Sequence, residues 1–260
     1  MITSSHNPKI QRVRGLLARH KDRVEARAFV VEGVRLLEEA LNAGHQPELV
    51  LYTRQLNERG QALLKQPLLA NCDVEQILPA LMESISGTEA PQGILGVIPF
   101  FAYPLPKDLN FVIIADGVRD PGNLGTLLRS AAAAGVQAVL LAPTCADAFA
   151  PKVVRAGMGA HFRMPVLELT WEETRQVVHA PSHSLTVYLA ESGSGKPYWQ
   201  AGFGRPAALL IGGEAEGASP EGRSLADEVI TIPMPGGSES LNAAVAASIL
   251  IFEVIRQRQL

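Results

Sequence analysis

The sequence predicts an α/β protein built from two parts, and three observations lead to this prediction. Short apolar runs alternate with segments of helical periodicity, three of those runs end at glycine-containing loops, and a proline-containing stretch over 99–109 divides the chain. Of the 260 residues, 47% are apolar but only 5% are aromatic, so the core must consist mainly of Ala, Val, Leu and Ile. A chain of this length fits one large domain, or a medium-sized domain with a small one.

The first part, residues 1–98, is predicted to be a small α/β domain. It opens with a helix over 9–20, because four apolar residues recur there at helical spacing. These residues are Ile10, Val13, Leu16 and Leu17. A second helix is expected over 34–44, where Gly44 is a typical helix-ending residue. Strands are expected at 28–33, 48–53 and 93–98.

The second part, residues 110–260, repeats a strand followed by a helix. Short, fully apolar strands that alternate with helices indicate a mostly parallel, buried sheet. The last helix, expected over 240–260, is rich in small residues, so another segment can pack close to its backbone. The strands are expected at 111–115, 138–142, 186–190, 207–211 and 228–232.

The charge and the cysteine content exclude several classes of protein. The net charge is −3 and the pI is about 6.1, so the chain is not a globally basic nucleic-acid binder, although a local basic patch is compatible with these values. Cys72 and Cys145 lie outside any CxxC pattern, and the six His show no metal-ligand spacing. We therefore expect no disulfide scaffold, no metal and a cytoplasmic location. We also expect no signal peptide, and the apolar run at 243–252 is too short to span a bilayer.

The first glycine-containing loop, DPGNLGTLLRS at 120–130, follows the apolar run FVIIA. A dinucleotide-binding loop would need GxGxxG spacing and an acid at the end of the next strand, and both are missing. Asn123 is compatible with a plain helix cap. Arg129 is harder to explain, because the helix dipole opposes a cation in the early turns of a helix. We therefore expect an anion to bind near Arg129.

Two further loops follow predicted strands. The segment LLIGGEAEGAS places Gly212 and Gly213 before Glu214; adjacent glycines let a ligand approach the backbone, although an ordinary turn also explains them. The segment ITIPMPGGSESLNAAVA places Ser240 and Asn242 at the start of the last helix, where Ser240 can be merely a helix cap. Ligands bind at the carboxyl ends of strands in open α/β sheets, so the three loops are expected to line one crevice.

Together and in order, these segments resemble the three motifs of the SpoU (TrmH-type) branch of the SPOUT RNA methyltransferases. They read DPGNLGTLLRSAAAAG, LLIGGEAEG and ITIPMPGGSESLNAAVAASILIFE, and the resemblance covers about 110–257. The segment SSHNPKIQRVRGLLARHKDRVEARAFVVEGVRLLEEAL resembles the L30e-like substrate-binding domain that precedes many of these enzymes. The resemblance implies an L30e-like domain at 1–98, a linker at 99–109, and a SPOUT catalytic domain at 110–260. That domain would contain a parallel sheet and a C-terminal deep trefoil knot, and the enzyme would be a homodimer.

The resemblance also implies that the chain transfers a methyl group from S-adenosylmethionine to a ribose 2′-hydroxyl of RNA. The residues at the catalytic positions of the motifs are Asn123, Arg129, Glu214, Ser240 and Asn242. The residues expected to bind the cofactor are Ala190, Gly212, Gly213, Ile232, Met234 and Leu241. A guanidinium stays protonated in proteins, so we expect Arg129 to clamp an RNA phosphate and stabilise the developing alkoxide, with a general-base role as the alternative. The neighbouring polar side chains would orient Arg129 and the ribose, while Glu214 would hold its loop or pair with Arg129.

Local positive charge is expected to bind the RNA. Residues 1–27 carry seven basic side chains against two acidic ones, in contrast to the net negative chain. Such a cluster is either a solvated basic helix or a surface that binds the RNA backbone. The residues expected to contact RNA are Lys9, Arg12, Arg14, Arg19, Arg23 and, in the second part, Arg155.

Three functions are compatible with the sequence. The first is an RNA 2′-O-ribose methyltransferase, with large-subunit (23S) rRNA favoured over tRNA because the N-terminal domain resembles those of rRNA enzymes. The second is a non-catalytic RNA-binding ribosome-assembly factor, which the presence of all five catalytic-type residues disfavours. The third is a nucleotide-dependent oxidoreductase, which the missing fingerprint acid disfavours. We expect no membrane partner, and the sequence does not identify the modified nucleotide.

Overall fold

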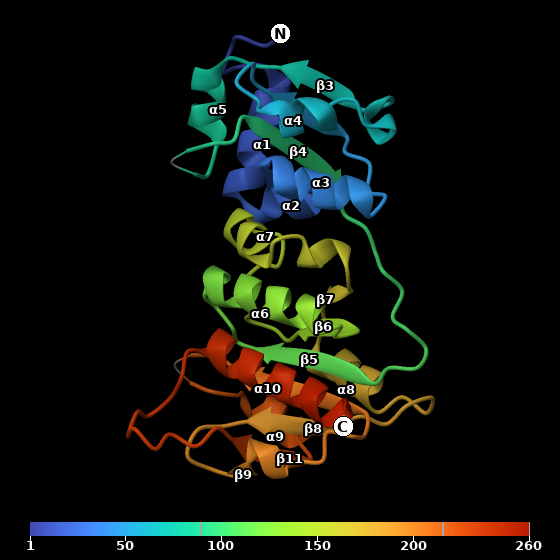
Figure 1. The fold of residues 1–260 in the computed structure, drawn as a ribbon, viewed down its shortest axis with the longest axis vertical. Helices are drawn as coiled ribbons and strands as arrows, with labels where there is room; N and C mark the ends of the chain where they lie inside the picture. Colours follow the sequence, from blue (N-terminus) through green and yellow to red (C-terminus); the bar gives the residue numbers. More distant parts are fainter. Residues whose placement is uncertain (89, 215, 260) are drawn as a thin grey trace. The chain divides into compact units, whose positions relative to one another are not determined.

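The computed structural model describes residues 1–88, 90–214 and 216–259 and divides the chain into two compact units (Figure 1). Unit 1 comprises Met1–Phe101 together with Phe149–Phe162, and unit 2 comprises the rest of the described chain. The sequence prediction assigns 149–162 to the second part, whereas in the structure this segment packs with unit 1.

Unit 1 contains a four-stranded mixed sheet. Its strands are β1 (Ala28–Glu32), β2 (Leu49–Tyr52), β3 (Asp73–Gln76) and β4 (Ile94–Pro99). They lie in the order β1-β4-β2-β3, with β4 antiparallel to both of its neighbours and β3 parallel to β2. The helices of unit 1 are α1 (Pro8–Ala18), α2 (His20–Ala26), α3 (Val34–Asn42), α4 (Glu58–Leu63), α5 (Pro79–Ile85) and α7 (Pro151–Gly157), with the 3-10 turns η1 (Pro67–Leu69) and η2 (Ala160–Phe162).

The predicted elements of unit 1 are confirmed within one or two residues at each end. In α1, three of the four residues predicted to share a face are fully buried, and Leu17 packs at the margin of the same core. Helix α3 ends just before Gly44, whose φ of +83° is the left-handed conformation that favours glycine. Strand β3 and helices α2, α4 and α5 are not predicted from the sequence, because their apolar patterns are short.

The sheet of unit 1 buries both of its faces. Successive residues of β1 alternate between two cores, since Phe29 belongs to the core beneath α3 and Val30 to the core beneath α1 and α5. The segment 149–162 supplies part of the first core. The ring of Phe29 lies 4.9 Å from that of Phe149 and 6.1 Å from that of Phe162, measured between centroids.

Unit 2 contains the predicted parallel sheet. Its strands are β5 (Phe111–Asp116), β6 (Ala138–Leu141), β7 (Val166–Glu168), β8 (Thr186–Ala190), β9 (Lys196–Pro197), β10 (Ala207–Gly212) and β11 (Glu228–Thr231). They lie in the order β7-β6-β5-β10-β8-β11-β9, and every neighbouring pair is parallel. All five predicted strands are confirmed. Strands β7 and β9 are not predicted from the sequence, because they have only three and two residues.

Helices cover both faces of the parallel sheet. They are α6 (Pro121–Ala133), α8 (Trp171–Val178), α9 (Pro220–Leu225) and α10 (Ala243–Arg258), with the 3-10 turn η3 (Tyr198–Gln200). Helices α6 and α10 pack against each other (Figure 1), where the Ser130 and Ser248 hydroxyls lie 2.8 Å apart. The prediction that a segment packs close to the small residues of the last helix is thus confirmed. The trefoil knot stays a prediction.

Both cysteines are free thiols. Burial raises the pKa of each thiol to about 11, so both are protonated at neutral pH. Within the described residues, no helix combines the length and apolar character needed to cross a membrane. In the same part of the chain, no three His, Cys, Asp or Glu side chains are grouped so that they could hold a metal ion.

Candidate functional site

A cavity of about 460 Å³ opens at the carboxyl ends of β8, β10 and β11, and we call it the strand-end cavity. Parallel strands bring these ends to one edge of the sheet, as expected from the sequence. Only the second and third motif loops line the cavity, because none of its described lining residues comes from the first loop, 120–130. All six residues expected to bind the cofactor line it, together with two of the expected catalytic residues. The eight residues are Ala190, Gly212, Gly213, Glu214, Ile232, Met234, Ser240 and Leu241.

The loop after β10 folds back on itself to form one wall of this cavity. Gly213 and Gly217 exchange two backbone hydrogen bonds, of 3.1 and 3.2 Å. A Cβ atom on Gly213 would lie 2.4 Å from the Gly117 carbonyl oxygen, and one on Gly212 would lie 2.5 Å from the Ala218 nitrogen. The two glycines are therefore required by the close approach of the chain's own backbone, which is a more direct reason than the ligand contact that the sequence suggests.

Asp116 fixes this loop, a role that is not predicted from the sequence. Its side chain, in a residue that is only 3% exposed, accepts a 2.6 Å hydrogen bond from the Ser219 backbone N–H. The bond joins the end of β5 to the start of α9, across 103 positions of the sequence. The signal available beforehand is an acid that directly follows the buried run FVIIA, because a buried carboxylate needs hydrogen-bond donors.

A chain of side-chain hydrogen bonds joins the three motif loops. Asn242 caps α10, since its Oδ1 accepts from the N–H groups of Ala244 and Val245. Its Nδ2 must therefore be the free donor, and it donates to Asn123 Oδ1 at 2.8 Å. Asn123 Nδ2 in turn donates to Glu214 Oε1 at 2.7 Å. Because the cap occupies the oxygen of Asn242, the donor and the acceptor of both side-chain bonds are determined. We call Asn242, Asn123 and Glu214 the amide relay.

The structure corrects the two helix-cap alternatives. Asp120 caps α6 by accepting from the Asn123 backbone N–H at 2.8 Å, so the Asn123 side chain is not the cap and is available to the relay. Asn242, and not Ser240, caps α10. Ser240 is exposed and lines the strand-end cavity.

Arg129 lies apart from the amide relay. It is exposed on α6, six residues beyond Asn123, which corresponds to about 9 Å along a helix. Within the described ranges it forms no hydrogen bond or ion pair. The predicted pairing of Glu214 with Arg129 is therefore not found, and the Glu214 carboxylate bonds to Asn123. Arg129 is available to a ligand outside the chain.

Carboxylates dominate the charge of the strand-end cavity. Among the residues that the structure describes, four carboxylates line it, from Glu191, Glu214, Glu216 and Glu239, against one guanidinium, that of Arg223, which forms an ion pair with Glu191. Burial by itself would raise the pKa of Glu191, but hydrogen bonds from Ser194 and Arg223 outweigh it and the net pKa is lowered. The cavity therefore favours a cationic ligand.

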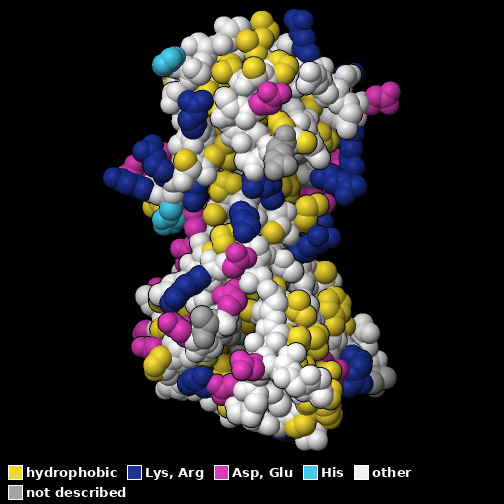
Figure 2. All heavy atoms as spheres, turned by 90° about the vertical axis from the view of Figure 1, so that its left-hand side faces the viewer, with side chains coloured by type: hydrophobic (Ala, Val, Ile, Leu, Met, Phe, Trp, Pro, Cys, Tyr) yellow, Lys and Arg dark blue, Asp and Glu magenta, His cyan; other side chains and the backbone are white. Residues whose placement is uncertain are grey.

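Two residues of the expected RNA-binding cluster in unit 1 are paired with carboxylates from distant segments. The Lys9 ammonium binds Asp73 at 2.6 Å and Glu75 at 2.7 Å, and these hydrogen bonds raise the pKa of Lys9. Arg12 forms an ion pair with Glu48. These charges are partly neutralised within the chain, and the face that Figure 2 draws carries acidic and basic side chains together.

Two further members of the cluster have partners close by. The Arg19 guanidinium lies 2.6 Å from the Asp22 carboxylate, one helical turn away. Arg14 is half-buried and reaches the Ser84 hydroxyl at 3.5 Å. The basic character that the sequence of residues 1–27 suggests is weaker once the fold supplies these partners.

Arg23 is a correction to the predicted RNA-binding set. The residue is only 5% exposed, and its Nη1 donates a 2.6 Å hydrogen bond to the Leu16 carbonyl oxygen. The guanidinium therefore holds α2 against α1 and does not face RNA. Arg23 is included in the basic cluster because counting charges along a sequence does not show which side chains are buried.

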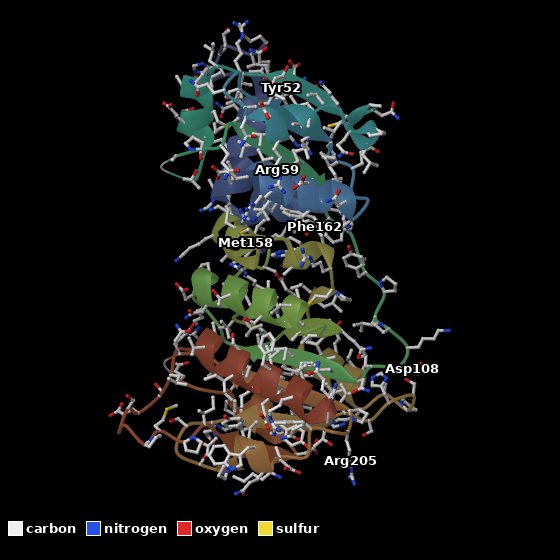
Figure 3. The ribbon with its side chains drawn as sticks, in the orientation of Figure 1. Tyr52, Arg59, Asp108, Met158, Phe162 and Arg205 are labelled. Carbon is white, nitrogen blue, oxygen red and sulfur yellow. The ribbon has the colours of Figure 1, made fainter. Side chains whose placement is uncertain are left out.

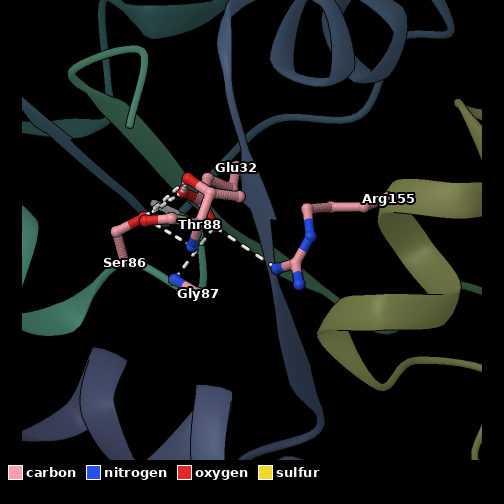
Figure 4. A network of polar contacts seen from close by, with 5 residues as sticks. All are labelled: Glu32, Ser86, Gly87, Thr88 and Arg155. Carbon is pink, nitrogen blue, oxygen red and sulfur yellow. Dashed lines mark hydrogen bonds and ion pairs between the residues drawn. The ribbon is translucent and has the colours of Figure 1, made fainter. Parts of the chain in front are cut away.

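Arg155 also has a structural partner (Figure 4). Its Nη1 lies 3.4 Å from the Glu32 carboxylate, whose side chain is 5% exposed. The same carboxylate accepts hydrogen bonds from the Ser86 hydroxyl, from the Thr88 hydroxyl at 2.7 Å and from the Gly87 N–H at 3.2 Å. Arg155 thus fastens α7 to β1 and to the loop at 86–88, within unit 1.

Comparison with known proteins gives two family matches. Residues 110–252 match the family model described as the SpoU rRNA Methylase family. Residues 7–96 match the one described as the MRM3-like substrate binding domain.

Two curated relatives and one solved structure illustrate the similarity. The chain is 31% identical to the 23S rRNA (guanosine(2553)-2'-O)-methyltransferase RlmP of Bacillus subtilis, over 97% of this chain and 98% of that protein. It is 34% identical to the mitochondrial rRNA methyltransferase 3 of Mus musculus, over 88% of this chain and 67% of that protein. The crystal structure of the SpoU methyltransferase AviRb from Streptomyces viridochromogenes, in complex with the cofactor AdoMet, superposes with a TM-score of 0.90 at 29% identity, over 98% of this chain and 99% of that one.

Proposed function

Because the chain belongs to the SpoU rRNA methylase family, we propose that it transfers a methyl group from S-adenosylmethionine to a ribose 2′-hydroxyl of large-subunit rRNA. One observation carries the proposal. The six expected cofactor residues line a single cavity, and the amide relay connects the wall of that cavity to α6, which bears Arg129. The 23S rRNA substrate of the Bacillus subtilis relative supports the choice of RNA.

The residues of the strand-end cavity fit this cofactor. Apolar side chains of Ile230, Ile232 and Leu241 offer surface to an adenosine, and the bends at Gly212 and Gly213 present backbone groups. The surrounding carboxylates favour a positively charged ligand. When bound, S-adenosylmethionine supplies a methyl group on a positively charged sulfur, which a nucleophilic oxygen can accept.

The amide relay would hold the site in register. It fixes the side chain of Asn123 between Asn242 and Glu214, so the loops after β5 and β10 and the start of α10 keep one relative position. Alignment of reacting groups is worth several kcal/mol in enzyme reactions, and small displacements are costly. Ser240, exposed at the rim of the cavity, would contact the ribose or the cofactor.

Arg129 would bind the RNA and stabilise the developing alkoxide. The guanidinium remains protonated in proteins, so it donates hydrogen bonds and does not remove the proton of the 2′-hydroxyl. That proton would pass to solvent water as the methyl group is transferred and the thioether leaves. Its forked geometry suits a phosphate. The sequence-based expectation that the helix dipole opposes a cation at this position is wrong, because Arg129 lies in the second half of the 13-residue helix α6. An external anion is supported instead by the exposure of Arg129, which has no hydrogen-bond or ion-pair partner within the described chain. A general-base role for Arg129 ranks second.

A second copy of the chain would pack on α10. Val245 and Phe252 lie seven positions apart, on one face of the helix, and are 47% and 51% exposed. Ile249 lies between them and is partly exposed. Figure 2 shows hydrophobic side chains gathered on one flank of unit 2. Burying such a stripe favours association. Phe252→Glu should shift the mass measured by light scattering from dimer to monomer, whereas an unchanged mass excludes this surface.

The central experiment measures methyl transfer from labelled S-adenosylmethionine to an unmethylated 23S rRNA transcript and to tRNA. We expect label in the 23S rRNA, and mass spectrometry of its fragments would locate the 2′-O-methyl group. Label in tRNA alone would reverse the choice of substrate. RNA binding without transfer to either RNA would indicate an assembly factor. The cytoplasmic location stays a prediction.

Arg129→Ala should abolish transfer while cofactor binding, measured by calorimetry, stays nearly normal. Arg129→Lys should rescue poorly, because an ammonium lacks the forked geometry. Near-normal turnover in Arg129→Ala would refute the clamp role.

A further inference from the structure

Unit 1 contains a second concave surface, which no sequence motif marks. It has a volume of about 460 Å³ and lies where the start of α3, the segment from β2 into α4, and the loop before β4 come together. Five long polar side chains line it, and we call it the polar hollow. They are Arg35, Gln55, Asn57, Arg59 and Gln92. Figure 3 labels Arg59 on α4 and Tyr52 at the end of β2.

Hydrogen bonding leaves this surface rich in donors. The Asn57 side-chain oxygen accepts from the Gly60 N–H at 2.9 Å, where it caps α4. The Gln92 side-chain oxygen accepts from the Val34 N–H at 3.0 Å. In each amide the side-chain oxygen therefore accepts from a backbone N–H, and the NH₂ group remains available as a donor. Neither NH₂ group has an acceptor within the part of the chain that the structure describes.

Arg35 adds a positive charge without a counter-charge. It is exposed, and among residues 1–88, 90–214 and 216–259 it forms no hydrogen bond or ion pair. The same holds for Arg54, on the neighbouring segment between β2 and α4. Arg59 is held by Glu38. This differs from the N-terminal helices of the same unit, where Lys9 and Arg12 each bind a carboxylate.

We propose that the polar hollow binds the phosphate backbone of the substrate rRNA, with Arg35 as its charged contact and Arg54, which precedes the lining residue Gln55 in the chain, as a second contact beside the hollow. A surface that offers guanidinium and amide donors, with its amide acceptors already used, is complementary to phosphate oxygens. Contacts of this kind set affinity and position without reading the base sequence. The proposal rests on the proposed function, because it takes the methylated rRNA as the ligand. The proposal also replaces the RNA-binding surface expected within residues 1–27 by a surface at the ends of β1 and β2.

The test compares two surfaces of one unit in the full-length chain. Binding of an unmethylated 23S rRNA transcript is measured by filter binding over a range of salt concentrations. The double variant Arg35→Ala, Arg54→Ala should weaken binding about 10-fold and lower the slope of log affinity against log salt by about 2, one per lost phosphate contact. The matched control, Lys9→Gln with Arg12→Gln, removes two charges from the N-terminal helices and should change affinity less than about twofold.

Two further readouts keep the test specific. The melting temperature of the double variant should be unchanged or slightly higher, because the helix dipole opposes a cation at Arg35 in the first turn of α3. Calorimetry should show unchanged binding of S-adenosylmethionine, since the strand-end cavity lies wholly in unit 2. Arg35→Lys, which keeps the charge, should retain most of the salt slope.

The proposal is overturned if the double variant binds the transcript as the wild type does, or if the control variant loses as much affinity. Its failure is distinguishable from failure of the proposed function. Wild-type chain that methylates the transcript, with normal RNA binding by the double variant, overturns the polar hollow alone. Loss of RNA binding in the double variant supports the polar hollow, even where the wild type transfers no methyl group.

Discussion

The strand-end cavity of unit 2 and the polar hollow of unit 1 have the same volume, about 460 Å³, but are built from different materials. The cavity is lined largely by glycines, small apolar residues and carboxylates at the ends of parallel strands. The hollow is lined by long amide and guanidinium side chains on loops of a mixed sheet. A backbone-lined site demands glycine at fixed positions and so leaves a sequence pattern. A site lined by single side chains on separate segments leaves none.

The two concave surfaces also differ in charge. Carboxylates outnumber guanidinium groups around the cavity, whereas the hollow carries an arginine without a counter-charge in the described chain. The difference divides the ligands between the units, because a cationic cofactor suits the first surface and a polyanionic RNA suits the second. The net charge of −3 conceals this division.

The largest effect is expected from adding one carbon to the backbone-lined site. Gly213→Ala places a Cβ 2.4 Å from the Gly117 carbonyl oxygen, so the loop after β10 must move. We expect methyl transfer to fall on the order of 100-fold, as for other small displacements in active sites, with weaker cofactor binding by calorimetry. Gly202→Ala is the matched control, because nothing lies within 4 Å of its added carbon. Wild-type kinetics in Gly213→Ala would show that the cavity does not depend on the close approach of the backbone at Gly213.

The second prediction concerns the stability that unit 1 gains from the segment 149–162, which lies between β6 and β7 in the chain. Phe162 is buried in the aromatic cluster around Phe29, so Phe162→Ala should lower the free energy of unfolding by about 3 kcal/mol, measured with urea. Trp199→Ala, at a half-exposed position, should cost less than about 1 kcal/mol. Equal costs would mean that the segment 149–162 is not part of the core of unit 1.

The third prediction sharpens the role of the amide relay. Asn123→Asp places a carboxylate against Glu214 and should lower kcat/KM about 10-fold, with a deficit that shrinks as pH falls because the two carboxylates then share a proton. Combining it with Glu214→Gln supplies an NH₂ donor to the new carboxylate and should recover part of the loss. If kcat/KM of the double variant is no higher than that of Asn123→Asp, the hydrogen bond between positions 123 and 214 does not explain the loss.

The last prediction leaves function aside and compares one thiol in each unit. The pKa of about 11 at Cys72 and at Cys145 lies about 2 above the ordinary value of 9.0, because burial penalises the thiolate. At pH 8 alkylation by iodoacetamide should therefore be roughly 100-fold slower in the folded chain than in urea. Labelling should accelerate as the pH rises toward 11. Equal alkylation rates with and without urea, measured by mass spectrometry, would show that the two thiols are not buried in the folded chain.

The sequence by itself determined the parallel sheet, its five longer strands and the edge of the sheet at which the strand-end cavity opens. These features depend on local periodicity and on a geometric rule, since the carboxyl ends of parallel strands meet at one edge of a sheet. Motif resemblance then assigned the individual positions. Asp116 and Asp120 were missed although each has a local signal, an acid directly after a buried apolar run and an Asp directly before a Pro that begins a helix. Their backbone N–H partners, however, could be assigned only from the structure.

Only the tertiary structure decided which charges are available. Lys9 and Arg12 meet carboxylates that are 36 to 66 residues away in the chain, and Arg23 is buried against a carbonyl oxygen. The tertiary structure also placed the segment 149–162 in unit 1. The physical reason is the same in each case. Local periodicity reports which face of an element is apolar, whereas ion pairing and burial depend on which distant segment packs against that face.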